Sequence, residues 1–313
     1  MEKQNAVRSG RLRHNLKRYW ELYVFLLVPM LYIIVFKYIP MGGLVIAFKD
    51  FKARAGIWGS EWVGLKNFVR FFDSHIFKTV MVNTLVLSLY SLIVSFPIPV
   101  LFALTINSVR NKRFRKVTQT IVNMPHFIST VVMVGIMMMI FNNRTGIYGN
   151  LVRMLTGEYP PNIFASPQGF RHAYVWSAVW QNFGWDSIIY TAALSGVDPS
   201  YHEAAQVDGA SRLKRVIHID LPTILPTIIT MLILKMGQVL TLGYEKILLL
   251  QNDLNLSASQ VISTYVYEVG LSGTGISDFS YATAIGMFNN VIQFILVVIV
   301  NQISKKVSET SLW

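Results

Sequence analysis

The chain has 313 residues, of which 53% are hydrophobic and 14% are charged. A soluble domain usually carries about 25% charged residues, and with no cysteine the chain can form neither disulfides nor thiolate metal sites. The formal net charge of +12 at pH 7 would suit a nucleic-acid partner, but its placement argues against one. Basic residues are concentrated in segment 1–20, directly before a long apolar run, which is typical of a cytoplasmic flank at anionic lipid.

Six segments have about the 20 mostly apolar residues that a membrane helix needs. The first follows the basic segment and lacks a small-x-small cleavage pattern, so we interpret it as a retained span rather than a signal peptide. Pro97 and Pro99 predict a kink in the second, because proline lacks a backbone donor. The predicted spans are Leu22–Phe48, Phe77–Ile106, Val117–Phe141, Phe170–Leu194, Pro222–Leu250 and Tyr281–Ile303.

The connectors between these spans indicate the topology. Asn107–Lys116 contains five basic residues and no acid, and Lys305 and Lys306 follow the last span. Both features place the even loops and both termini in the cytoplasm of a bacterial cell, with the chain in its plasma membrane. The first outer loop is also basic, which weakens this bias, and its aromatic residues suggest that it lies along the membrane interface. The predicted regions are a basic tail (1–20), a first helix with its outer loop (21–76), a five-helix core (77–303) and a C-terminal tail (304–313).

The segment between the fourth and fifth predicted spans begins with a helix. Asp198 followed by Pro199 is typical of an N-cap and a first helical residue. This helix is expected to run to about Val207, where Gly209 can break it.

A second short helix should follow, capped by Ser211 and running through His218, before Pro222 opens the fifth span. Two short helices at an angle, with small residues on the first and basic residues on the second, would form a compact cytoplasmic knob. Small side chains would let this knob fit deeply into a groove of a partner, and Glu203 could hold it there by a charged hydrogen bond.

These residues resemble the EAA loop of bacterial ABC importer permeases. Glu203-Ala204-Ala205, Gly209, Ile219 and Leu221-Pro222 match that loop at every specified position and at its spacing, within segment 198–222. The resemblance implies that the knob is the coupling helix that docks on a separate ATPase. It assigns coupling to Glu203, Ala204, Ala205, Asp208, Gly209 and Arg212.

Further motifs are similar to one branch of this family, the permeases for sugars and oligosaccharides. These are Phe36-Lys-Tyr-Ile-Pro-Met, Ile46-Ala-Phe-Lys-Asp-Phe, Val63-Gly-Leu-Lys-Asn-Phe, Gly243-Tyr-Glu-Lys-Ile, Val261-Ile-Ser-Thr-Tyr-Val-Tyr and Ser308-Glu-Thr-Ser-Leu-Trp. The resemblance implies an all-α membrane protein with the type I ABC importer permease fold, related to the maltose importer, with an N-terminal helix beside a five-helix core. It also implies a heterodimer with a second permease, two ATPase subunits that hold ATP and Mg²⁺, and an extracytoplasmic binding protein.

Motifs for catalysis or nucleotide binding do not occur in the sequence. There is no Gly-x4-Gly-Lys-Ser/Thr phosphate loop, no His-Glu-x-x-His pair and no Gly-x-Ser-x-Gly elbow. We therefore expect a transport subunit rather than an enzyme, with no catalytic residue, metal site or cofactor of its own.

Polar residues inside the spans are candidates for the substrate pathway, since such residues are costly in a membrane. Sugars present hydroxyls around apolar faces, so amides beside aromatic rings would suit them. The candidates are Trp180, Gln181, Asn182, Trp185, Gln238, Asn289 and Asn290. Tryptophans near span ends also form interface belts, and amides also join helices, so each candidate has a structural alternative. Lys235 is expected to pair with a carboxylate or a carbonyl, or to snorkel.

The sequence thus predicts the permease of an ATP-driven oligosaccharide importer. A permease for peptides, amino acids or phosphate is the first alternative, because the EAA loop is not specific to sugars. A membrane enzyme acting on lipid-linked sugars and a channel or carrier working alone are the others. Neither the sugar nor the partner subunits can be named from the sequence.

Overall fold

The computed structural model describes residues 18–271 and 277–308, so most of the predicted basic tail 1–20 lies outside the described residues. The described chain is almost entirely helical. A single antiparallel pair of strands, β1 (Lys49–Asp50) and β2 (Glu61–Trp62), is present in this part of the chain, with Lys49 opposite Trp62. The all-α prediction is confirmed.

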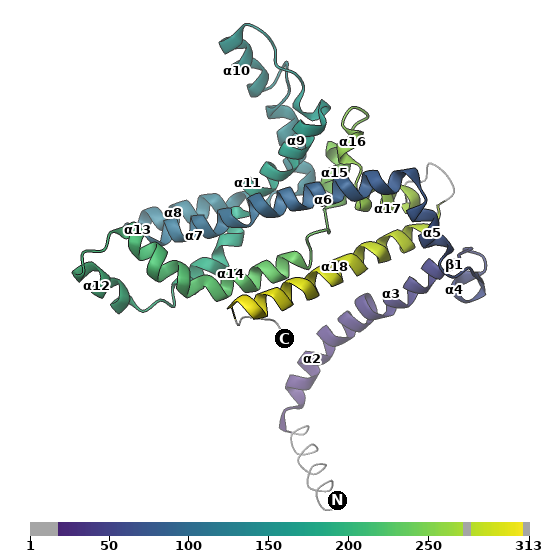
Figure 1. Ribbon diagram of the computed structural model, residues 1–313, viewed down its shortest axis with the longest axis horizontal. Coiled ribbons are helices and arrows are strands. Elements are labelled where there is room, and N and C mark those ends of the chain that lie inside the picture. The colour runs from purple at the N-terminus through teal and green to yellow at the C-terminus, as the bar shows by residue number, and fades with distance from the viewer. Residues whose placement is uncertain (1–17, 272–276, 309–313) are drawn as a thin grey trace, which may run out of the picture.

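The first predicted span is a continuous helical run with changing hydrogen-bond pattern. It consists of α2 (Trp20–Ile33), η1 (Ile34–Tyr38), α3 (Ile39–Met41) and η2 (Gly42–Phe48). None of the described residues of α2 is buried, and η2 alone packs firmly against a distant helix, α18 (Phe279–Ser308). The run therefore leans away from the rest of the chain, as Figure 1 shows for α2 and α3.

A small region with a hairpin follows this run. It contains the two strands, α4 (Gly56–Gly59) between them, and α5 (Lys66–Phe72). The Lys49 ammonium lies inside the hairpin and donates to the carbonyl of Ile57 at 2.9 Å and to that of Ser60 at 3.3 Å. The hairpin is thus closed around a buried cation by backbone acceptors.

The second predicted span is one helical run of 33 residues, His75–Asn107. Its helix assignment breaks at Phe96, between α6 (His75–Ser95) and α7 (Pro97–Asn107). This position comes just before Pro97 and Pro99, which lack backbone donors, but Phe96 keeps helical φ and ψ, so the predicted kink stays a prediction.

The third predicted span, Val117–Phe141, is not one straight helix. It is built from α8 (Lys112–Asn123), η3 (Met124–Phe127) and α9 (Thr130–Ile140), and the two parts meet at 101°. Pro125 lies inside η3, and Ser129 caps the new helix by accepting from the Val132 amide at 3.4 Å. The segment is therefore a broken span or a re-entrant loop.

The fourth predicted span is the centre of the fold. After α10 (Ile147–Thr156) and η4 (Ile163–Ala165), α11 (Pro167–Leu194) runs for 28 residues and packs against α6, α7, α8 and α14 (Leu221–Met236). It is long enough to cross a membrane, but it is not among the helices that are also apolar enough by composition.

The fifth predicted span, Pro222–Leu250, contains two separate helices in the structure. Its helical run ends at Met236, and the chain turns through Gly237–Gly243 before α15 (Tyr244–Leu250) begins. Hydropathy alone does not show this break, because both sides of the turn are apolar. The remaining described helices are α12 (Pro199–Val207), α13 (Arg212–Arg215) with η5 (Val216–Asp220), α16 (Leu256–Ser259) and α17 (Ile262–Leu271).

Six spans are therefore not confirmed as a count. Among the described residues, four runs are long and apolar enough to cross a membrane, and the bent pair α8–α9 makes five at most. These four are Trp20–Phe48, His75–Asn107, Arg212–Met236 and Phe279–Lys306.

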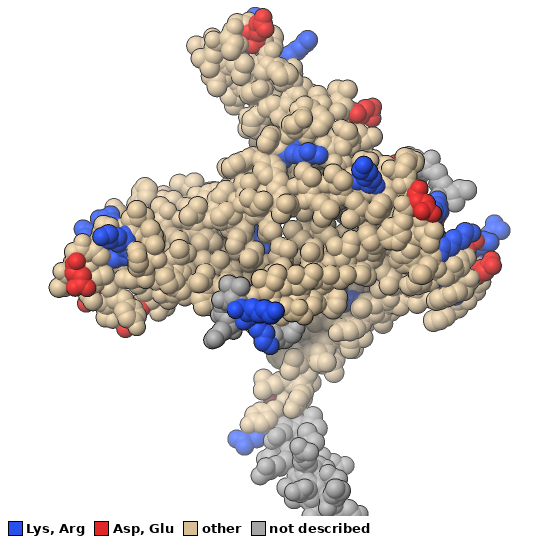
Figure 2. All heavy atoms as spheres, viewed as in Figure 1, with Lys and Arg blue, Asp and Glu red and all other residues tan. Residues whose placement is uncertain are grey.

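The helices form an elongated body with two different ends (Figure 1). Helices α12 and α13 lie at one end, and α5 with the hairpin lies at the other, while α9 and α10 project from the side. On the face drawn in Figure 2, charged side chains gather at both ends, a few basic groups lie nearer the middle, and uncharged surface covers most of the body between them. This distribution suits a body that crosses a membrane along its long axis.

Candidate functional site

The predicted knob is present, and its first helix has the predicted bounds. In α12, the Asp198 side chain accepts from the Ser200 amide at 2.9 Å, and Pro199 is the first helical residue. This hydrogen bond from the Ser200 backbone lowers the pKa of Asp198 below its usual value, because it stabilises the carboxylate. The helix begins here because its first free amides find an acceptor.

Gly209 ends this helix in a conformation that few other residues adopt. Its φ is +76°, and a Cβ built there would meet no other atom within 4 Å. The Gly209 amide donates to the Gln206 carbonyl at 3.1 Å, and the Ala210 amide donates to the Ala205 carbonyl at 2.8 Å. This is the Schellman arrangement, in which glycine at the left-handed position satisfies the last carbonyls of a helix.

The second part of the knob, α13, continues directly into a run that is long and apolar enough to cross a membrane. Ser211 caps α13, as predicted, but no separate helix ends at His218. Instead, α13, η5 and α14 form one helical run from Arg212 to Met236. The π-type stretch η5 lies just before Pro222, whose missing amide cannot complete the regular α-helical pattern.

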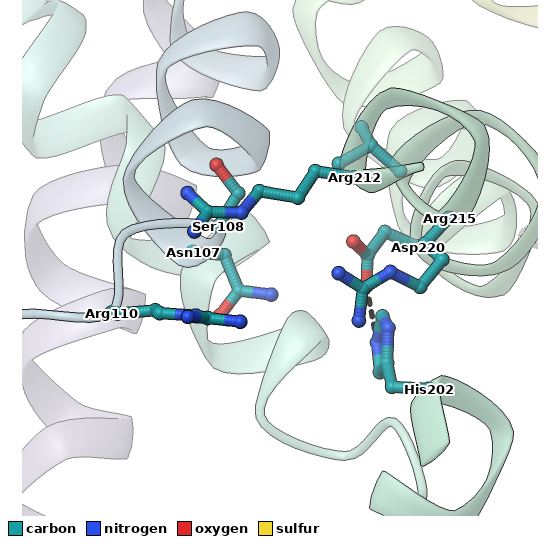
Figure 3. Close-up of a pocket in the computed structure, with 8 residues that line it drawn as sticks. Asn107, Ser108, Arg110, His202, Arg212, Arg215 and Asp220 are labelled. Carbon is teal, nitrogen blue, oxygen red and sulfur yellow. Dashed lines mark hydrogen bonds and ion pairs between the residues drawn. The ribbon is translucent and has the colours of Figure 1, made fainter. Parts of the chain in front are cut away.

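A polar contact inside the knob was not predicted. His202 of α12 and Asp220 of η5 meet at 3.1 Å, and Asp220 is only 2% exposed (Figure 3). The contact joins the first helix to the base of α14. Sequence reasoning missed it because the two residues lie 18 positions apart on different elements, so no helical spacing relates them.

Much of the surface of the knob is exposed. Glu203, Ala204, Asp208, Gly209 and Arg212 are exposed, and Ala205 is half-buried. Val207 is 88% exposed and Leu213 is 68% exposed, which is unfavourable for apolar side chains in water. The six predicted coupling residues therefore lie together on a surface of mixed charge and apolar character that suits a protein partner.

The pathway candidates on α11 split into two groups. Trp180 is 48% exposed and lines a largely apolar cavity of about 540 Å³ between α9 and α11. Gln181 instead donates to the Ile128 carbonyl at 2.7 Å, where the chain turns into α9. Gln181 thus stabilises the sharp bend between η3 and α9.

Asn182 and Trp185 contact the same bend at His126. Asn182 Oδ1 lies 3.0 Å from His126 Nδ1, and its amide donates to the Ala178 carbonyl at 3.0 Å. The Trp185 ring stacks on the His126 ring, with centroids 4.4 Å apart. His126 is therefore a structural group at this bend.

The candidates outside α11 lie near another link between helices. Gln238 and Asn290 are exposed, whereas the Asn289 amide oxygen is buried without a hydrogen-bond partner. One turn further along α18, Gln293 accepts from Thr241 at 2.7 Å, which ties the segment after α14 to α18. The structure does not place these residues in the cavity beside Trp180.

The expected partner of Lys235 is present. Its ammonium lies 2.9 Å from the Asp186 carboxylate, so the pair joins α14 to α11. A second link, missed from the sequence, lies beside the cavity: Trp176 donates to the Tyr90 hydroxyl at 3.0 Å, and this hydroxyl lies 2.7 Å from His172 Nδ1.

Comparison with known proteins identifies the class. Residues 95–309, more than half of the chain, match the family described as "Binding-protein-dependent transport system inner membrane component". The chain belongs to this family. It is therefore a membrane permease subunit of an ABC importer and not an enzyme, which confirms the predicted resemblance and the fold type.

Individual relatives are similar over nearly their whole length. The polygalacturonan/rhamnogalacturonan transport system permease protein YteP of Bacillus subtilis is 41% identical over 93% of this chain and 90% of its own. Protein LplB of the same organism is 40% identical over 95% of this chain and 92% of its own. A chain of a bacterial ABC transporter involved in the import of the acidic polysaccharide alginate is 38% identical, with a TM-score of 0.86 over 95% of this chain and 99% of that chain.

Proposed function

We propose that this permease forms, with a second related permease, the pathway for an oligosaccharide that an extracytoplasmic binding protein delivers. The relatives point to this substrate class, because their names include polygalacturonan, rhamnogalacturonan and arabinooligosaccharide transport. One similar structure is an alginate transporter in complex with an alginate pentasaccharide-bound periplasmic protein. Uronate-containing oligosaccharides are the first candidates.

The exposed knob carries the energetic part of the proposal. Its apolar and charged surface is unoccupied by this chain, and its second helix continues without interruption into α14. A separate ATPase that binds the knob would therefore transmit its movement directly to the membrane helix α14. The Lys235–Asp186 pair would pass the movement from α14 to α11. ATP and Mg²⁺ would be held by the two ATPase subunits.

The orientation follows from the same reasoning. With the knob on the ATPase, its end of the molecule faces the cytoplasm, together with Asn107–Lys116 and both termini. The hairpin and α5 then face outward, where the binding protein docks. The apolar surfaces that this chain leaves exposed on α2 and on the projecting α9 support a second permease subunit beside it.

The proposal is tested by ATP hydrolysis in the reconstituted assembly of both permeases, the ATPase and the binding protein. The panel contains neutral oligosaccharides, uronate-containing oligosaccharides, amino acids and peptides. Hydrolysis is expected to rise with one oligosaccharide class and with no amino acid or peptide. Stimulation by peptides or amino acids alone would contradict the substrate class and leave the importer assignment standing.

A variant of this chain tests whether the cavity between α9 and α11 contributes to sugar-stimulated hydrolysis. Trp180→Ala removes an exposed ring from the cavity wall and is expected to raise the sugar concentration for half-maximal stimulation by about threefold to tenfold. Trp20→Ala is the control, because Trp20 is equally large, is 60% exposed and lies at the start of α2, outside this cavity and away from the hairpin. Equal shifts in both variants would contradict a pathway role for Trp180.

A further inference from the structure

A second cavity lies at the base of the knob. It has a volume of about 210 Å³ and opens between the end of α7 and the segment from α12 to η5 (Figure 3). A water molecule occupies roughly 30 Å³ in the liquid, so the space is large enough for a small polyatomic anion. The lining residues are Asn107, Ser108, Arg110, His202, Arg212, Arg215, Val216 and Asp220.

The charges of this lining are unbalanced. Three arginines and one aspartate give a net charge of 3 − 1 = +2 with His202 neutral. The Asp220 carboxylate already has His202 as a partner and lies within the electrostatic influence of Arg215. Within the described ranges, Arg110 and Arg212 form no salt bridge, and Arg215 Nε is buried without a hydrogen-bond partner. A guanidinium with unused donors around a cavity favours a planar or tetrahedral oxyanion.

The geometry brings these donors together from distant parts of the chain. Arg110 comes from the loop after α7, whereas Arg212 and Arg215 come from α13, and Figure 3 shows the guanidinium groups on different sides of one space. The Asn107 amide adds a neutral donor at the cavity wall. Two segments about 100 positions apart in the sequence therefore supply one set of anion donors.

The position of the cavity indicates which kind of oxyanion it would bind. It lies where the run His75–Asn107 ends and the run Arg212–Met236 begins. The ends of membrane helices lie at the level of the lipid headgroups, and basic pockets between such helices on the cytoplasmic side bind anionic headgroups. Free phosphate presents the same oxygen atoms to the same donors.

We propose that this cavity is a binding site for one phosphate group, carried by an anionic lipid of the cytoplasmic leaflet or by soluble phosphate. The bound group would connect the loop after α7 to α13 and would fix the knob relative to the membrane. The site adjoins the exposed coupling surface around Glu203, with Arg212 at the boundary between the two, and it is separate from the cavity beside Trp180.

The test measures binding rather than transport, so it does not depend on the substrate. The assembled transporter is purified in detergent with phosphatidylcholine only. Phosphatidylglycerol is titrated in one arm and followed by native mass spectrometry, and inorganic phosphate is titrated in the other and followed by calorimetry. The double variant Arg110→Gln/Arg215→Gln is compared with Arg113→Gln/Lys116→Gln, which removes the same charge from exposed side chains of α8 outside the cavity.

The cavity variant is expected to bind one of the two ligands at least about tenfold more weakly than the native chain, because charge-assisted hydrogen bonds are lost. The control variant should retain native affinity. Dependence on phosphatidylglycerol identifies a lipid site, and dependence on inorganic phosphate identifies a soluble ligand. Native affinity of the cavity variant in both arms, or equal loss in both double variants, would overturn the proposal. If the double variant does not assemble, Arg110→Gln in the exposed loop gives the same comparison against Arg113→Gln.

Discussion

Gly209→Val is expected to abolish substrate-stimulated ATP hydrolysis and uptake while the permease remains in the membrane. Valine at a φ of +76° is strained by about 1–3 kcal/mol, so the chain would leave the Schellman turn. A Cβ at this position meets no other atom within 4 Å, so the effect comes from the backbone and not from a clash inside the chain. We expect stimulated hydrolysis in the reconstituted assembly to fall at least about tenfold.

Gly196→Val is the matched control for this variant. Gly196 lies in the turn before α12, its φ is not positive, and a Cβ there makes only an ordinary contact of 3.4 Å with the Ala193 carbonyl. Glu203→Lys is expected to cause a similar loss, because it reverses the charge on the exposed face of the knob. Unchanged uptake with both Gly209→Val and Glu203→Lys would show that the knob does not couple the ATPase.

Gly184→Val is expected to prevent correct packing of the permease. Helix α11 approaches α8 so closely at Gly184 that an ideal Cβ would lie 2.3 Å from the Val122 carbonyl oxygen. This neighbour is backbone, so no side chain can move aside, and α8 must shift as a whole. Overpacking of this kind costs about 1–3 kcal/mol or more. The shift would also strain the Gln181–Ile128 hydrogen bond at the bend into α9.

The measurement for Gly184→Val is the thermal unfolding midpoint and the monodisperse fraction of the purified protein in detergent. Gly286→Val is the control, because Gly286 also lies inside a long membrane helix, α18, and a Cβ there meets nothing within 4 Å. Equal midpoints for the two variants would mean that α8 and α11 leave room for a side chain at Gly184.

The parts of the fold that the sequence predicts well are those with local signals. The bounds of α12 follow from Asp198 and Pro199 at its start and from Gly209 at its end, and the structure has the helix where they place it. The break in the helix assignment at Phe96 comes just before Pro97, which lacks a backbone amide donor. In each case the deciding atoms lie within a few residues of one another.

The parts that the sequence does not predict depend on distant contacts. Pro125 and Ser129 mark the break between α8 and α9 locally, but the 101° bend is also held by Gln181 from another helix, a contact that local signals do not show. The break after Met236 is hidden because apolar residues lie on both sides of it. Two amides that suggest a sugar site, those of Gln181 and Asn182, instead stabilise the bend, since an amide in a span satisfies backbone groups as readily as a ligand.

The decisive measurement is the accumulation of a labelled oligosaccharide in proteoliposomes that contain both permeases and the ATPase. The binding protein and sugar are supplied on the hairpin side, and ATP is supplied on the knob side. Accumulation is predicted to require ATP, the ATPase and the binding protein together, and to be lost in the Gly209→Val variant. Accumulation by this chain without the ATPase would contradict the importer mechanism and would identify a carrier that works alone.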